Sequence, residues 1–260
     1  MTIISELSSL EDAEVKKDPE IADMMKKGIR DVIIFMPSVS YISRMVKSLE
    51  KLNESLDKKI LPLAITAFDI NQGSENYRML MAPTTELKLP NGDTPYRRVI
   101  VSTNVAETGL TLEGLRYCID TALVFTNEYN PRHDAYMFVV KPTTSSMSLQ
   151  RKGRVGRKFP GVFYPLFTEQ VFNHMIVDNT PNILVENITA HILAMICRSS
   201  TGSVNDLTIS GLLTPPSDES VSQALECLFT LGAIDRYGII TKTGEMLNVF
   251  RKLPIQSCKM

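Results

Sequence analysis

Two arginines and a glutamine near the middle of the chain have the types and the spacing for phosphate chemistry. They lie in one octet, with Arg154 four residues after Gln150 and Arg157 three residues later. If the octet is helical, this spacing places the three side chains on one side of the helix. Arginine keeps its charge and forks onto phosphate oxygens, so two in register can stabilise charge that develops on a transferred γ-phosphate. A glutamine beside them can orient the attacking water.

Two glycines interrupt the same octet and favour close approach of another group. In a helix that is only solvated, each glycine costs up to about 1 kcal/mol relative to alanine, and here Gly153 and Gly156 stand beside the arginines. The alternative is a basic surface helix or a simple patch for a phosphate backbone, which the octet alone leaves open.

A second polar stretch follows a predicted buried strand. The run from Thr103 to Thr111 is rich in small hydroxyl residues and contains one acid, Glu107. At the carboxyl end of a strand, backbone amides and hydroxyls can hold phosphates or a sugar–phosphate backbone without demanding a base identity. The alternative is an ordinary loop between a strand and a helix.

The elements that must position these stretches alternate between strands and helices. Short apolar runs predict buried strands, and apolar residues at helical spacing over 39–49 predict a helix that packs on them. The predicted strands are 32–36, 61–65, 99–103, 117–124 and 161–167. This order is typical of an α/β domain with a mainly parallel sheet. The segment 125–140, with a turn at Asn130-Pro131, predicts a β-hairpin excursion from the sheet.

The pattern changes near residue 181. Helical spacing predicts a helix over 183–195, and Ser217-Asp218 predicts the capped start of a second helix, followed by a hairpin that turns at Gly238. Two helices and a small hairpin are the parts of a winged-helix module. We therefore expect an N-terminal linker or helix at 1–29, without a clear apolar face, an α/β domain at 30–180, and a small, mostly helical winged-helix domain at 181–260.

Composition limits the classes of protein. The chain carries 28 Lys and Arg against 29 Asp and Glu, so any nucleic-acid contact would be a local groove. The 4 cysteines and 3 histidines are scattered without zinc spacing, which predicts no metal site within the chain. Apolar runs are shorter than the roughly 20 residues of a membrane span, and the N-terminus has no signal-peptide features. These features predict an intracellular protein without membrane contact.

Together the two polar stretches resemble the fifth and sixth signature motifs of superfamily 2 helicases in their DEAH-box form. The run 103–111, TNVAETGLT, is similar to the family's TNIAETSLT, and the octet 150–157 is similar to its QRxGRxGR. Residues 31–42 resemble the fourth motif, and 212–260 resemble the winged-helix region. The resemblance covers roughly 31–260 and implies the second RecA-like domain of such a motor.

The resemblance implies roles at matching positions. Gln150, Arg154 and Arg157 would meet the ATP phosphates, with the two arginines as arginine fingers. Thr103 and Asn104 would contact the backbone of a single nucleic-acid strand, which the hairpin would guide. The residues expected beside the nucleotide and its magnesium shell are Gly109, Thr111, Glu113 and Gly153.

Three positions depart from the family pattern. Gly109 stands where the family has serine, and Glu113 replaces its aspartate. Near 78–80 the family has an aromatic that stacks on adenine, whereas Tyr77 is out of register here. Weak base stacking would suit low discrimination among nucleoside triphosphates.

Two expected motifs are absent from the sequence. There is no Gly-x-x-x-x-Gly-Lys-Ser/Thr and no Asp-Glu-x-His, so the phosphate cradle and the primary magnesium ligand would lie elsewhere. We expect the C-terminal motor half of an ATP-dependent RNA helicase, inactive in ATP hydrolysis alone, within a longer polypeptide that carries these motifs. The chain would end inside the winged-helix module. Its partners would be single-stranded RNA, with DNA left open, and the first RecA-like domain of the same protein.

Two alternatives remain open on the sequence. A helicase-like scaffold that binds nucleic acid without sensing nucleotide is favoured by Gly109 and the missing aromatic, but opposed by Gln150, Arg154 and Arg157. A plain winged-helix binder is opposed by the near-neutral charge and the α/β half. The octet is also reminiscent of helicases of large DNA viruses, which would place the protein in the cytoplasm or a virion.

Overall fold

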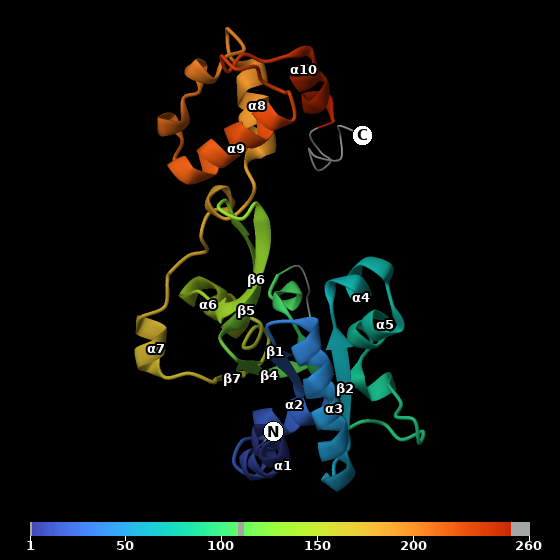
Figure 1. Ribbon diagram of the computed structural model, residues 1–260. Helices are drawn as coiled ribbons and strands as arrows, with labels where there is room; N and C mark the ends of the chain where they lie inside the picture. Colours follow the sequence, from blue (N-terminus) through green and yellow to red (C-terminus); the bar gives the residue numbers. More distant parts are fainter. Residues whose placement is uncertain (1, 109–111, 251–260) are drawn as a thin grey trace. The chain divides into compact units, whose positions relative to one another are not determined.

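The computed structural model describes residues 2–108 and 112–250, which form two compact units (Figure 1). We call them the sheet unit, comprising the described residues up to 125 and residues 140–179, and the helical unit, comprising 126–139 and the described residues from 180 onward. The predicted Gly109 and Thr111 sites therefore lie outside the described residues.

The centre of the sheet unit is a five-stranded parallel sheet with the order β2-β3-β1-β4-β7. Its strands are β1 (Asp31–Phe35), β2 (Ile60–Ile65), β3 (Arg97–Ser102), β4 (Leu115–Asp120) and β7 (Val162–Pro165). β1 and β3 are buried along their whole length, and β4 is buried except at its first residue. Such burial is typical of continuous apolar strands in a sheet that is covered on both faces. The predicted parallel α/β class is confirmed.

One strand prediction was wrong. The apolar run 117–124 is two strands, because β4 ends at Asp120 and β5 (Leu123–Asn130) begins after a turn. Ala122 adopts a positive φ of 55°, and its backbone N–H donates to the Asp120 carboxylate at 2.8 Å. β5 pairs with β6 (Ala135–Pro142) in a separate two-stranded sheet, which confirms the predicted hairpin.

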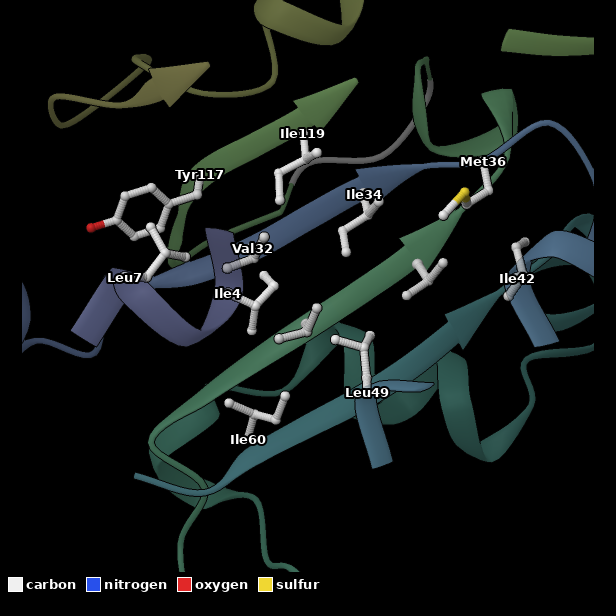
Figure 2. Packing of buried hydrophobic residues seen from close by; sticks show 12 residues of the cluster. Ile4, Leu7, Val32, Ile34, Met36, Ile42, Leu49, Ile60, Tyr117 and Ile119 are labelled. Atoms are coloured by element: carbon white, nitrogen blue, oxygen red, sulfur yellow. The ribbon is translucent and has the colours of Figure 1, made fainter. Parts of the chain in front are cut away.

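Helices cover both faces of the parallel sheet. On one face, α1 (Thr2–Val15) and α3 (Val39–Ser55) pack against the side chains of Val32 and Ile34 (Figure 2). On the other face, Ile33 and Phe35 pack with residues of α4 (Ala67–Gln72), of α5 (Glu75–Met81) and of the short 3-10 helix Asn104–Ala106. The remaining helices of this unit are α2 (Pro19–Lys26), α6 (Ser145–Lys152) and α7 (Glu169–Asn173).

The N-terminal segment contributes to this core, so the expectation that it lacks an apolar face was wrong. Leu7 of α1 is fully buried, and Figure 2 shows it beside Tyr117. Farther along α1, Glu11 forms a buried ion pair with Arg97 at 2.5 Å. The predicted start of α2 is confirmed, since Asp18 caps it and Pro19 is its first residue.

The helical unit has its own apolar core. Its helices are α8 (Thr189–Arg198), α9 (Asp218–Thr230) and α10 (Lys242–Val249), and antiparallel bridges join Ser203 to Ile239 and Ile234 to Ile240. The predicted capped helix is confirmed, because the Ser217 hydroxyl accepts from the backbone of Ser220. The outer part of the β5–β6 hairpin belongs to this unit, where Arg132 contacts Glu219 at 2.7 Å. Within the described part of the chain, none of the helices combines the length and apolarity that a membrane span needs.

Candidate functional site

The two edges of the parallel sheet carry different candidate sites. Because all five strands run the same way, their carboxyl ends share one edge and their amino ends share the other. Thr103 and Asn104 follow β3 at the carboxyl edge, where Asn104 is exposed and Thr103 is partly buried. A cavity of about 550 Å³ lies at the amino edge, beside Gly28 before β1 and Gly114 before β4.

Three chain segments form the walls of this cavity together with residues 27–29, which precede β1. The first is the end of α5 and the loop after it, from Leu80 to Thr85, and the second is the stretch 112–115. The third follows α6 and includes Arg154, Arg157 and Phe159. Phe159 is the one aromatic side chain among the described lining residues, and the sequence analysis had not considered it.

A buried arginine fixes the first two walls relative to each other. Arg98 of β3 donates from Nη1 to the carbonyls of Met79, Leu80 and Ala82, and from Nη2 to the carbonyl of Glu113. Its guanidinium also pairs with Asp31, 2.7 Å away. Burial raises the pKa of the Asp31 carboxyl, and the charge of Arg98 opposes that rise. The sequence signal was a charged residue directly before the predicted buried strand 99–103, and a charged residue is almost never fully buried without a partner.

The cavity lining is strongly cationic. Lys27, Arg154, Arg157 and Lys158 line it together with Arg98, whereas Glu113 is the one acid among the described lining residues. Asp31 neutralises Arg98 and Asp23 pairs with Lys27 at 2.6 Å, so three further cations face one carboxylate. Partial burial and the charge of Arg157 both lower the pKa of Arg154. Crowded positive charges in a concave site favour an anionic ligand.

The octet is not helical along its whole length, which is the condition that would place Gln150, Arg154 and Arg157 on one side of a helix. α6 ends at Lys152 and Gly153 is its C-cap, so Arg154 and Arg157 lie in the turns that follow. Gly156 has a φ of 77°, a left-handed conformation that breaks helical continuity. Arg157 is exposed and its Nε donates to the Gly153 carbonyl at 3.0 Å.

The structure brings some of the predicted nucleotide-site residues together and leaves others apart. Arg154, Arg157 and Glu113 share the cavity, and Glu113 contacts Lys158 at 3.1 Å. Gln150 is exposed on α6 and is not among the described residues that line the cavity, and the same holds for the C-cap Gly153. No group of metal-binding side chains was found in the described ranges 2–108 and 112–250.

The third arginine of the octet, Arg151, is fully buried between the two edges, and the sequence analysis gave it no role. Its Nη1 contacts Asp120 at 2.7 Å and its Nε contacts Glu107 at 3.2 Å, while its guanidinium lies over the Phe35 ring, 5.0 Å from the centroid. Burial raises the pKa of the Glu107 carboxyl, and the charge of Arg151 opposes that rise.

A protein family and several known proteins are similar to this chain. Residues 16–159 match a family model described as helicase conserved C-terminal domain. Proteins named as candidate RNA helicases, B962L, in two African swine fever virus isolates from South Africa and Malawi are each 35% identical over 245 residues. The alignments cover 88% of this chain, which spans 26% and 25% of those relatives.

Two crystal structures of HrpB from Escherichia coli are similar in fold. They are described as a DExH-box NTPase and as a DEAH/RHA helicase, with TM-scores of 0.70 and 0.68 at 22% identity. They match 88% of this chain and 26% and 27% of their own. At this identity the likeness shows the fold alone, and it confirms the predicted RecA-like arrangement.

Proposed function

We propose a motor function from one premise: this chain belongs to the helicase conserved C-terminal domain family. In this proposal the sheet unit is the second RecA-like domain of an ATP-dependent RNA helicase. Its amino-edge cavity faces the ATP phosphates, and its carboxyl edge binds a single strand of RNA. The helical unit would be the winged-helix domain, with the β5–β6 hairpin guiding the strand.

The observation that carries the proposal is that Arg154 and Arg157 both line one cationic cavity. Two guanidiniums at a concave surface can hold the β- and γ-phosphates and neutralise charge during phosphoryl transfer. The cavity volume of about 550 Å³ suits a ligand of nucleotide size. A helicase-like scaffold without nucleotide sensing would have no need of this cluster.

ATP and magnesium fit the chemistry of this lining. Leu80, Met81 and Phe159 offer apolar surface for a base and ribose, while the arginines offer charge for the phosphates. A bound magnesium ion would neutralise phosphate charge, and its primary ligands would come from the first RecA-like domain, because this sequence lacks the phosphate cradle. Glu113 would lie near the nucleotide, and Gln150 would need the closed pair of domains to reach it.

We propose RNA as the nucleic acid that binds at the carboxyl edge, because the viral relatives are named as candidate RNA helicases. Asn104 is exposed at the carboxyl edge, and the neighbouring Thr103 is partly buried. Such groups contact a sugar–phosphate backbone without reading a base. An enzyme of this kind would work inside a cell, in the cytoplasm or in a virion.

The test replaces the arginines in the intact helicase polypeptide that carries this chain. Arg154→Ala or Arg157→Ala should lower RNA-stimulated ATP hydrolysis by about 10³-fold or more while RNA binding is retained. The matched control is Arg44→Ala, because Arg44 is an exposed arginine on α3 outside the cavity. An unchanged ATPase rate in the cavity variants would favour the scaffold instead.

The same proposal predicts that this chain alone does not hydrolyse ATP. Phosphate release should appear when it is combined with a first RecA-like domain that carries the missing motifs. Hydrolysis by the isolated chain, lost in Arg154→Ala, would contradict the division of the active site between two domains.

A further inference from the structure

We propose that Glu11 of α1 is a positioning residue for the amino-edge cavity, because it fixes the cavity wall at 27–29 through two neighbouring side chains. These belong to Tyr96, directly before β3, and to Arg97, its first residue. The inference rests on the proposed function, since it gives this wall a part in ATP binding. Glu11 itself touches no ligand in this role. It precedes residues 16–159, to which the family model matches, so that match gives no role to α1.

One oxygen of the Glu11 carboxylate binds two donors. Oε2 accepts a hydrogen bond from Arg97 Nη2 and, at 3.0 Å, another from the Tyr96 hydroxyl. The side chains of Glu11 and Arg97 are each 1% exposed, so solvent screens their charges little. In surroundings of low dielectric such a contact is strong, and its loss is costly. α1 therefore fixes both donors at the amino edge of the sheet.

Both donors also contact Arg30, the residue that follows the wall. Arg97 Nη1 donates to the Arg30 carbonyl at 3.4 Å, and the Arg30 guanidinium lies over the Tyr96 ring, 4.2 Å from its centroid. The backbone and the side chain of Arg30 are thus held by two different partners of one carboxylate. The planar fork of an arginine presents donors in fixed directions, which the single ammonium of a lysine does not reproduce.

The wall at 27–29 is closely packed against the rest of the cavity. The N–H groups of Gly28 and Ile29 donate to carbonyls in the last turn of α2. Gly28 has a φ of 77°, and a Cβ on it would lie 3.3 Å from Thr85 in the facing wall. A Cβ on Gly114 would lie 3.5 Å from the Gly28 carbonyl oxygen. Because this packing leaves little free space, a displacement of the wall would change the outline of the cavity.

A second ion pair joins α1 to the sheet and serves as a comparison. Glu14 Oε2 lies 2.6 Å from Arg116 Nη2, and the Arg116 side chain is 2% exposed. In the part of the chain that the structure describes, Arg116 Nε and Nη1 have no hydrogen-bond partner. The two pairs therefore share a helix and a type of contact, but only the Glu11 pair continues through hydrogen bonds toward the cavity wall.

The alternative is that both ion pairs only hold α1 on the sheet. Four variants of the intact helicase polypeptide separate the two roles. Glu11→Gln and its control Glu14→Gln each remove one carboxylate charge from α1. Arg97→Lys keeps a positive charge beside Glu11 but loses the fork that also reaches Arg30. Its control is Arg116→Lys.

Four properties are measured for each variant. They are the Kd of mant-ATP, a fluorescent ATP analogue, with magnesium; the KM and kcat of ATP hydrolysis with poly(U) RNA; the RNA affinity by fluorescence anisotropy; and the thermal unfolding midpoint. A purely structural role changes the unfolding midpoint, whereas a positioning role also changes the affinity for the nucleotide.

The positioning role predicts weaker nucleotide binding without a loss of turnover. Glu11→Gln and Arg97→Lys should raise the Kd of mant-ATP and the KM for ATP about tenfold, equivalent to about 1.4 kcal/mol of binding free energy. The kcat and the RNA affinity should stay near wild type, because the cavity wall contributes to binding and not to the chemical step. Glu14→Gln and Arg116→Lys should lower the unfolding midpoint and leave the Kd and the KM unchanged.

Three outcomes would overturn the role of Glu11. One is an equal rise of the Kd and the KM in the two control variants, which would reduce the effect to the docking of α1. Another is a wild-type Kd in Arg97→Lys, the variant that decides if Glu11→Gln does not fold. The third is a parallel loss of RNA affinity, which would indicate a change of the whole domain. Failure of the proposed function is recognised separately, because the helicase would then keep its ATPase rate after Arg154→Ala.

Discussion

Arg98 and Asp31 form an ion pair beneath the cavity, with 2.7 Å between Nη2 and Oδ2 and with side chains that are 3% and 0% exposed. The same guanidinium holds three carbonyls of one cavity wall and one carbonyl of another. The shape of the candidate nucleotide site therefore depends on a charge pair that faces the protein interior.

Replacing Arg98 with methionine should lower the free energy of unfolding by about 3–5 kcal/mol, because it leaves the Asp31 charge buried without its partner. Chemical denaturation measures the change. The control is Lys27→Ala, since Lys27 and Asp23 form an exposed pair on α2, and its loss should cost less than about 1 kcal/mol. Similar costs for the two variants would contradict this assignment.

Replacing Leu7 with alanine should destabilise the sheet unit by about 2–5 kcal/mol, because the side chain is fully buried against the sheet. The matched control on the same helix is Leu10→Ala, because Leu10 is 50% exposed. Thermal unfolding of both variants compares them. Equal melting temperatures would show that α1 is not part of the folded core in solution.

Replacing Phe159 with alanine should raise the KM for ATP roughly two- to tenfold, the range of a single aromatic contact, with kcat little changed. Steady-state hydrolysis by the intact helicase measures it. Phe68→Ala is the control, since Phe68 is 70% exposed on α4 and does not line the described cavity.

Comparing the hydrolysis of ATP with that of GTP, CTP and UTP tests the expected low discrimination among nucleoside triphosphates, which a strong preference for ATP would contradict.

Replacing Asp69 with asparagine should lower stability by about 0.5–2 kcal/mol near neutral pH, because Asp69 completes the capping box of α4. Burial would raise the pKa of this carboxyl, but hydrogen bonds from Thr66 and Ser74 outweigh burial and lower it. The carboxylate therefore contributes its full stability above the ordinary value of 3.8, and loses it as pH falls through the lower folded pKa. Unfolding midpoints from pH 2 to 7 should show the wild-type advantage shrinking in acid.

Part of the candidate site could be predicted from local sequence. The motifs at 103–111 and 150–157 are contiguous stretches, and the helicase resemblance drawn from them is confirmed by the family match. The helix caps at Asp18 and Ser217 were also predictable, because a cap depends on residues within one turn. The position at which α6 ends could not be predicted, because helix propensity alone did not show that Gly153 would be its C-cap.

By itself, the sequence determined the alternation of buried strands and helices, the hairpin excursion and the helicase motifs, because each depends on neighbours in the chain. Only the tertiary structure decided that Arg154 and Phe159 share a cavity with Leu80, and that Arg151 is buried against Glu107. The strand order β2-β3-β1-β4-β7 differs from the chain order, and it brings together residues far apart in sequence. The spacing of residues along the chain does not predict these contacts, because they form only when the sheet has assembled.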